Sequence, residues 1–153
     1  MRAKQTKLAL IFMGTGAFMV LLLAGVHFLL AGGREYELRL PDFQNLRGVT
    51  LSRQDGGEYP LADACGEDVL FILKGNGRTT RAESIQDMPA NVEGLIRVDF
   101  SHRGGGTSTV FVYRRAGARN GEYFLEQPYN GIYEISGDAY QAIENYASKE
   151  YAR

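Results

Sequence analysis

The stretch LIRVDFSHRGGGTSTVFVYRR, residues 95–115, contains the pattern that decides the fold. Apolar and polar side chains alternate from 96 to 101, which is typical of a strand with one buried face. The glycine-rich segment 103–106 then reverses the chain, and residues 109–114 alternate again in a return strand. The sequence therefore predicts an antiparallel hairpin.

Other extended segments surround this hairpin. Alternating or short apolar runs predict strands at 34–40, 47–53, 122–126 and 132–135, with turns at 55–57 and 120–121. Residues 78–91 are polar and are expected to form a loop.

Two segments have a helical period instead. Apolar residues between 69 and 73 predict a helix over 63–74, with Asp63 as its N-cap and Gly75 or Gly77 at its end. Ser136 is a suitable N-cap for a terminal helix. The expected fold class is α+β: an antiparallel β-sheet meander with both helices packed on one face, preceded by an N-terminal transmembrane helix.

The N-terminal segment is long enough to cross a membrane. No charged side chain occurs from Leu8 to Leu30, and these 23 residues would form a helix of about 34 Å, against a hydrocarbon core of about 30 Å. The basic flank at 1–7 should remain cytoplasmic, which places the rest of the chain outside. We therefore expect two parts, a signal anchor at 1–33 and an extracytoplasmic domain at 34–153, in a single-pass protein of the cell membrane.

Processing of this segment has an alternative. Ala31 and Gly33 are small residues at the spacing that signal peptidase requires, so cleavage after Gly33 competes with an uncleaved anchor. The residues Leu23-Ala24-Gly25 resemble the start of a bacterial lipoprotein signal. Lipid attachment is excluded there, because Val26 occupies the position of the cysteine that would be acylated.

Charge and composition limit the partners and cofactors. Three of the 17 basic residues lie in the first 33 residues. The rest of the chain therefore has 14 basic and 18 acidic residues, and its net charge is about −4. Such a domain lacks the basic surface that nucleic acids bind. With one cysteine and one histidine after residue 33, we expect no intrachain disulfide, no metal site, no cofactor and no nucleophile–base pair.

Two segments, ESIQDMP at 83–89 and EQPYNGIY at 126–133, combine carboxylates, an amide and tyrosines. Such groups can form a polar and aromatic binding surface. They can equally serve turns and strand ends, where serine, aspartate, proline and glycine have structural uses. The candidate binding residues are Glu83, Ser84, Asp87, Glu126, Gln127, Tyr129 and Tyr133.

These two segments, together with GTSTVFVY at 106–113, resemble a family of domains of unknown function. The family occurs in small exported or membrane-anchored proteins of Gram-positive Firmicutes, and the resemblance extends over residues 36–148. It implies an extracytoplasmic setting and brings no catalytic residues with it.

The leading functional hypothesis is a non-enzymatic module that binds an envelope protein or a cell-wall component. A hydrolase or transferase is the alternative, with Glu83, Asp87 and Glu126 as acid and base, which would require these carboxylates to converge in one cleft. A structural or inhibitory module without a pocket is a third possibility.

Overall fold

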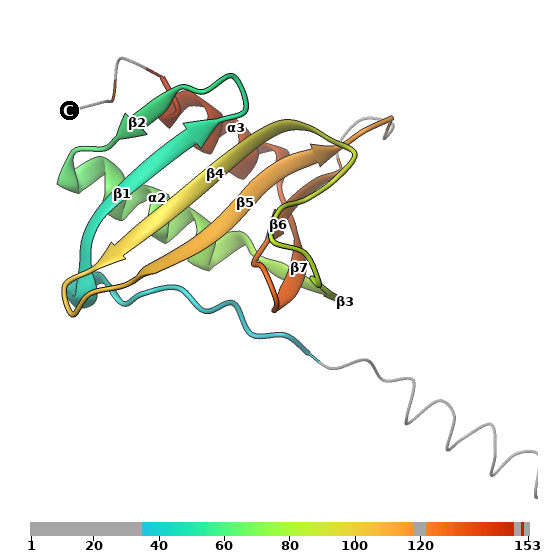
Figure 1. The fold of residues 1–153 in the computed structure, drawn as a ribbon, viewed down its shortest axis with the longest axis horizontal. Coiled ribbons are helices and arrows are strands. Elements are labelled where there is room, and N and C mark those ends of the chain that lie inside the picture. Colours follow the sequence, from blue (N-terminus) through green and yellow to red (C-terminus); the bar gives the residue numbers. More distant parts are fainter. Residues whose placement is uncertain (1–34, 118–121, 149–150, 152–153) are drawn as a thin grey trace, which may run out of the picture. The chain divides into compact units, whose positions relative to one another are not determined.

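The computed structural model describes residues 35–117, 122–148 and 151 (Figure 1). In chain order its elements are the 3₁₀ helix η1 (Phe43–Asn45), β1 (Leu46–Arg53), β2 (Glu58–Pro60), α2 (Asp63–Asn76), β3 (Arg78–Glu83), β4 (Val92–His102), β5 (Thr107–Arg115), β6 (Tyr123–Glu126), β7 (Gly131–Ile135) and α3 (Gly137–Tyr146).

One antiparallel sheet contains all seven of these strands, in the order β2-β1-β4-β5-β6-β7-β3. The expected hairpin is confirmed as β4 and β5, which pair from Ser101↔Thr107 to Val92↔Arg115. Two glycines of its turn, Gly105 and Gly106, have φ values of 90° and 87° that other residues rarely adopt. Strands β4 to β7 follow one another across the sheet, so the expected meander is confirmed for these four strands, whereas β3 departs from it and pairs with β7 at the far edge.

Both helices cover the same face of the sheet, as the sequence predicted, and in Figure 1 they lie behind it. The main core lies between helices and sheet. It is built from residues such as Val98 of β4, Val110 of β5, Leu70 of α2 and Ile143 of α3, all with no exposed surface. Ser136 caps α3 as expected, because its Oγ accepts a 3.1 Å hydrogen bond from the Ala139 amide.

The opposite face of the sheet, which we call the outer face, has a second and smaller apolar cluster. It contains Leu95, Phe111, Tyr113 and Phe124, with Val92 and Ile132 packed against it. The alternation in β5 predicted this division, since Phe111 and Tyr113 belong to the outer cluster whereas Val110 and Val112 belong to the main core. Residues 84–91, the β3–β4 loop, contribute to the outer face through Met88, which lines a hollow with Leu95 and Phe111.

The sequence predicted a strand at 34–40, but residues 35–40, the part of it that the structure describes, do not form one. Residues 35–42 are extended but have no strand partner. The alternation itself was read correctly, because Tyr36, Leu38 and Leu40 are half-buried and pack against the main core. Side-chain amides, described below, take the place of a neighbouring strand for the backbone of this segment.

The prediction of a loop over 78–91 was wrong for residues 78–83, which form strand β3. This strand pairs with β7 at the edge of the sheet, and five of its six residues are exposed, so no apolar alternation marks it. Strand β2 is a second edge that the sequence did not indicate. Helix α2 is preceded by Ala62 rather than capped by Asp63, and it ends at Gly77, one of the two glycines expected there.

The anchor at 1–33 and the turn at 120–121 lie outside the described residues. Within the described part of the chain, no helix has the length and apolar character needed to cross a membrane.

Candidate functional site

The β3–β4 loop meets the β6–β7 loop, residues 127–130, at one end of the outer face. Ser84 follows β3 directly, and its amide donates to the carbonyl of Asn130 over 3.3 Å. Its Oγ donates a 2.6 Å hydrogen bond to Oε1 of Glu126, the last residue of β6. The two motif segments that the sequence singled out are therefore joined, although 42 residues separate Ser84 from Glu126.

Glu126 is a buried carboxylate held by two hydroxyl groups. Its exposed fraction is 3%, and Oε2 accepts a 2.8 Å hydrogen bond from the Tyr113 hydroxyl. Burial, followed by the hydrogen bond to Glu126, raises the pKa of Tyr113 well above its ordinary value. Ser84 is likewise buried, at 2%. These side chains pair with one another and have little surface left for a ligand.

Gln127 and Asn130 hold the segment 35–42 against the domain. The Gln127 amide accepts from the Arg39 N–H over 2.9 Å and donates to the Arg39 carbonyl over 2.7 Å, so it contacts that residue as a neighbouring strand would. Asn130 Nδ2 lies 2.7 Å from the Glu37 carbonyl and 2.7 Å from Gln127 Oε1. We call Gln127 and Asn130 the amide clasp, and it fixes the chain that leads to the predicted anchor.

Tyr133 and Gly131 support this clasp. The Tyr133 hydroxyl lies 3.2 Å from Asn130 Nδ2, its side chain is 2% exposed, and burial raises its pKa. A Cβ at Gly131 would stand 2.5 Å from Cβ of Tyr36 and 3.0 Å from the Tyr133 hydroxyl. Only glycine therefore lets Tyr36 pack so close to β7.

Tyr129 differs from these residues because it is exposed. Its hydroxyl donates a 2.7 Å hydrogen bond to Oδ1 of Asp87, and this bond raises the pKa of Tyr129. Its φ of 56° is in the left-handed region, which is unusual for a bulky side chain. Backbone strain of this kind is concentrated at sites of function. The contact joins the tips of the two loops on the surface.

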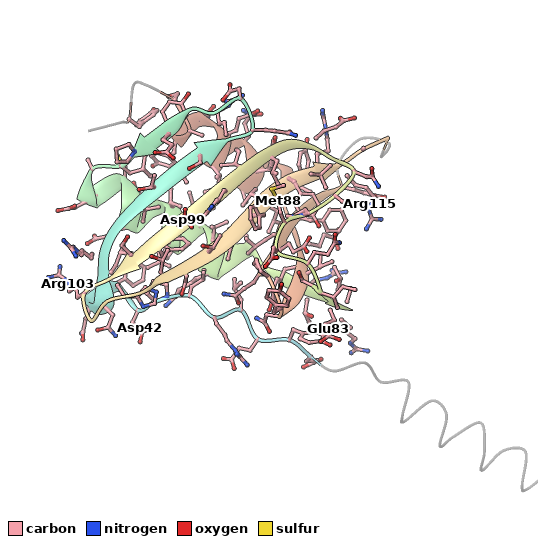
Figure 2. All side chains as sticks on the ribbon, in the orientation of Figure 1. Asp42, Glu83, Met88, Asp99, Arg103 and Arg115 are labelled. Carbon is pink, nitrogen blue, oxygen red and sulfur yellow. The ribbon has the colours of Figure 1, made fainter. Side chains whose placement is uncertain are left out.

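Three apolar side chains of the two loops are exposed, and we call them together the loop patch: Ile85, Met88 and Tyr129, exposed by 74%, 58% and 67%. Figure 2 shows Met88 over the outer face and Glu83 near the end of β3. Glu83 is exposed and lies opposite Gly131 in the register of β3 and β7.

The three carboxylates of the enzymatic hypothesis have three different settings. Glu126 is buried between Ser84 and Tyr113, Asp87 is bound to Tyr129, and Glu83 is exposed at the sheet edge. No cluster of metal-ligating side chains occurs in the part of the chain that the structure describes.

Two hollows lie on the outer face beside the loops. One, of about 500 Å³, is lined by Asp87 and Met88 of the β3–β4 loop with Leu95, Arg97 and Phe111 of the sheet. The other, of about 430 Å³, is more polar and lies along the β6–β7 loop and residues 107–109. The exposed part of the candidate site thus continues into concave surface on both sides of the Tyr129–Asp87 contact.

Sequence reasoning missed four residues that matter here. Tyr113 and Asn130 complete the buried hydrogen bonds, and Ile85 and Met88 supply most of the apolar surface of the loops. Ile85 and Met88 carried a usable signal, because each is an apolar residue in an otherwise polar stretch. Tyr113 carried none, since it was read as part of the apolar alternation of β5.

Residues 34–134 match the model of a family, DUF5301, described as "Domain of unknown function (DUF5300)". The chain belongs to this family. The expectation that the chain belongs to a family of unknown function is confirmed, while the distribution of the family among organisms and its sequence motifs remain predictions.

A solved structure, titled "NMR structure of the protein from Ruminococcus gnavus", is similar to the DUF5301 chain. The two have 28% sequence identity and a TM-score of 0.51, over 67% of this chain and 97% of the other. A search of curated proteins found no match.

Proposed function

We propose that this protein is a non-enzymatic binding module, held by residues 8–30 at the outer face of the cell membrane, whose loop patch docks a protein of the cell envelope. The observation that supports the proposal is the loop patch. Of the large apolar side chains that are exposed in the described residues, three come from these two short loops. Clustered exposed apolar groups mark interaction sites, and Met and Tyr are enriched at protein interfaces.

The loops are also held in place before any partner arrives. The β3–β4 loop is fixed at Ser84 by Glu126 and at Asp87 by Tyr129. A preorganised surface loses less conformational entropy on binding than a mobile one. The sheet edges are poorly suited to a partner by comparison, because β2 is three residues long and contains Pro60, while β3 has a bulge near Arg81.

The amide clasp supports a position close to the membrane. If Leu30 ends the span, seven residue steps lead to Glu37, the first residue whose backbone the clasp holds, and a chain of that length reaches at most about 25 Å. The proposed partner would then be another protein at the membrane surface.

Site-specific photo-crosslinking on intact cells tests the docking role. A photoreactive residue at Met88 should give a discrete adduct with one envelope protein, and the same residue at Phe71, which is 70% exposed on α2 behind the sheet, should not. Replacing Ile85 by serine should weaken the Met88 adduct without loss of folded protein. Equal adducts from both positions would remove the loop patch from consideration.

The anchor is tested separately. Mass spectrometry of the mature membrane protein should detect peptides from residues 8–30. Their absence, with a new N-terminus at Arg34, would favour cleavage after Gly33. A membrane-impermeant protease added to intact cells should digest the domain, and full protection would contradict the proposed orientation.

A further inference from the structure

Strand β5 is longer than one of the strands beside it. It pairs with β4 from Thr107 to Arg115, but β6 begins to pair with it only at Phe111, opposite Glu126. Among the strands that the structure describes, none therefore neighbours residues 107–110 of β5 on the β6 side. This stretch lies inside the sheet, away from its two outermost strands, β2 and β3. We call it the open edge of β5.

The backbone groups of Thr107 and Thr109 point toward this open side. The His102 amide of β4 donates to the carbonyl of Gly106 over 3.1 Å. Backbone groups along an antiparallel strand point alternately to its two neighbours, so every second residue from Gly106 faces β4, whereas Thr107 and Thr109 face away from it. Within the described residues, no backbone hydrogen bond joins Thr107 or Thr109 to a group on the open side. Each residue thus offers one N–H and one C=O to an added strand.

The β6–β7 loop explains why β6 does not close the gap. If β6 continued in register beyond Glu126, Pro128 would lie opposite Thr109, and proline has no N–H to donate. The loop instead bonds to itself, because the Gln127 amide donates to the carbonyl of Gly131 over 3.0 Å. The chain therefore turns away from β5 and leaves its edge open.

The hollow of about 430 Å³ occupies this gap. It is lined by residues 107–109, by the β6–β7 loop and by Arg39 of the segment 35–42, which is cyan in Figure 1. The four residues 107–110 provide about 13 Å of edge at about 3.3 Å per residue, which is enough to pair with a short extended segment. Many peptide-binding domains recognise their ligands as an added strand, where backbone hydrogen bonds provide the affinity.

We propose that the open edge of β5 binds an extended peptide segment of the partner protein, which adds to β5 as a short strand. The inference rests on the docking role proposed above and names the form in which the partner is recognised. The row of N–H and C=O groups favours a peptide over a glycan, because it matches the repeat of another backbone.

The open edge is continuous with the loop patch. Tyr129 belongs to the patch and also lines the hollow of the open edge. The side chain of Thr109 lies on the outer face, as does that of Phe111 two residues later. A partner side chain opposite Thr109 would lie on this face as well. One extended segment can therefore pair with β5 and reach the exposed side chains of the loops.

Crosslinking from the open edge tests this geometry. Photoreactive residues are placed one at a time at Thr107 and Thr109 of the full chain on intact cells, and each should capture the protein that Met88 captures. Side chains two apart on a strand share a face and are about 7 Å apart, so tandem mass spectrometry should locate the two attachment sites two residues apart in one partner segment. Attachment to a glycan, to a second copy of this chain or to scattered partner residues would overturn the proposal.

Proline at Thr107 removes one free N–H group. Thr107 is the first residue of β5, where proline is tolerated, so Thr107→Pro should keep the urea unfolding midpoint of the unaltered chain. In phospholipid nanodiscs, the ¹³C methyl signal of Met88, the one methionine after residue 33, reports this midpoint. The adduct from Met88, measured below saturation, should fall about tenfold, because a backbone acceptor of the partner is left unpaired.

Glu58→Pro is the matched control. The Gly57 carbonyl accepts a 2.8 Å hydrogen bond from the Arg53 amide of β1, so the N–H of Glu58, the next residue, points away from β1. Glu58 is likewise the first residue of its strand, β2. This variant also loses an N–H without a strand partner, but far from the loops in the strand order, and the Met88 adduct should be unchanged.

The outcomes separate this inference from the proposed function. If a folded Thr107→Pro chain gives an undiminished Met88 adduct, strand addition fails and the docking role stands. If Thr107→Pro shifts the unfolding midpoint, the spacing of the attachment sites, obtained with an unaltered backbone, decides alone. If neither Met88 nor Thr107 gives an adduct with an envelope protein, the proposed function and strand addition both fail.

Discussion

Removing the hydroxyl groups around Glu126 tests whether this carboxylate is a structural part of the domain. Ser84→Ala deletes the 2.6 Å hydrogen bond to Oε1, and Tyr113→Phe deletes the 2.8 Å hydrogen bond to Oε2. Because Glu126 is 3% exposed, water cannot readily replace either donor. A hydrogen bond to a charged group contributes about 1.5–3 kcal/mol, so each variant should lower the free energy of unfolding by about 2 kcal/mol.

The double variant should lose more than the two single variants together. With one hydroxyl remaining, the Glu126 carboxylate retains a donor, whereas removal of both Ser84 Oγ and the Tyr113 hydroxyl leaves it bare in the interior. Groups that share one partner show coupling of about 0.5–3 kcal/mol, and we expect about 1 kcal/mol here.

Urea unfolding of the full chain, followed through the Met88 methyl signal, measures these differences. Tyr146→Phe is the matched control, because the Tyr146 hydroxyl bonds to Asp68 on the exposed surface over 3.0 Å, and its loss should cost less than about 0.5 kcal/mol. Single variants at Ser84 and Tyr113 that are no less stable than this control would refute the structural role. Glu126 would then again be a candidate for chemistry.

Three other predictions concern the clasp and its surroundings. Burial and the hydrogen bond to Glu126 raise the pKa of Tyr113 above its ordinary 10.0, so the folded chain retains a proton that the unfolded chain loses. The free energy of unfolding should therefore fall as the pH rises above 10, by up to about 1.4 kcal/mol per pH unit from this residue, and less steeply in Tyr113→Phe. Gln127→Ala removes both hydrogen bonds to Arg39 and should speed amide exchange at Arg39 by at least about tenfold, whereas unchanged exchange would contradict the clasp. Gly131→Ala should destabilise the domain by about 1–3 kcal/mol in urea unfolding, since its Cβ would stand 2.5 Å from Cβ of Tyr36; a neutral effect would show that residues 35–42 can move aside.

The parts of the fold that the sequence predicted depend on local chemistry. The β4–β5 hairpin combines strict alternation with a glycine turn. Helix α3 begins at a serine, Ser136, whose side chain binds the amide three residues further along the chain. Both signals lie within a few neighbouring residues. The edge strand β3 was missed because its exposed side chains record no burial, and its partner β7 lies some fifty residues away.

The candidate site was predicted in composition but not in role. All seven chosen residues lie on or beside the two loops, yet Ser84, Glu126, Gln127 and Tyr133 are buried. A polar residue in a sequence does not show whether it faces water or a distant donor. The partner of Gln127 is the backbone of Arg39, 88 residues away. Because every residue has the same backbone groups, the sequence does not indicate which residue is the partner.

The burial of these residues changes which part of the motifs is available to a partner. Glu126, Gln127 and Asn130 direct their polar atoms inward. Their partners are Tyr113, Arg39 and Glu37, so a substitution at any of the three disturbs the fold and does not act on a ligand directly. The exposed side chains lie where the backbone is fixed by these inner contacts. The motif segments are therefore best understood as a support, and the loop patch that they position is where binding specificity should be sought.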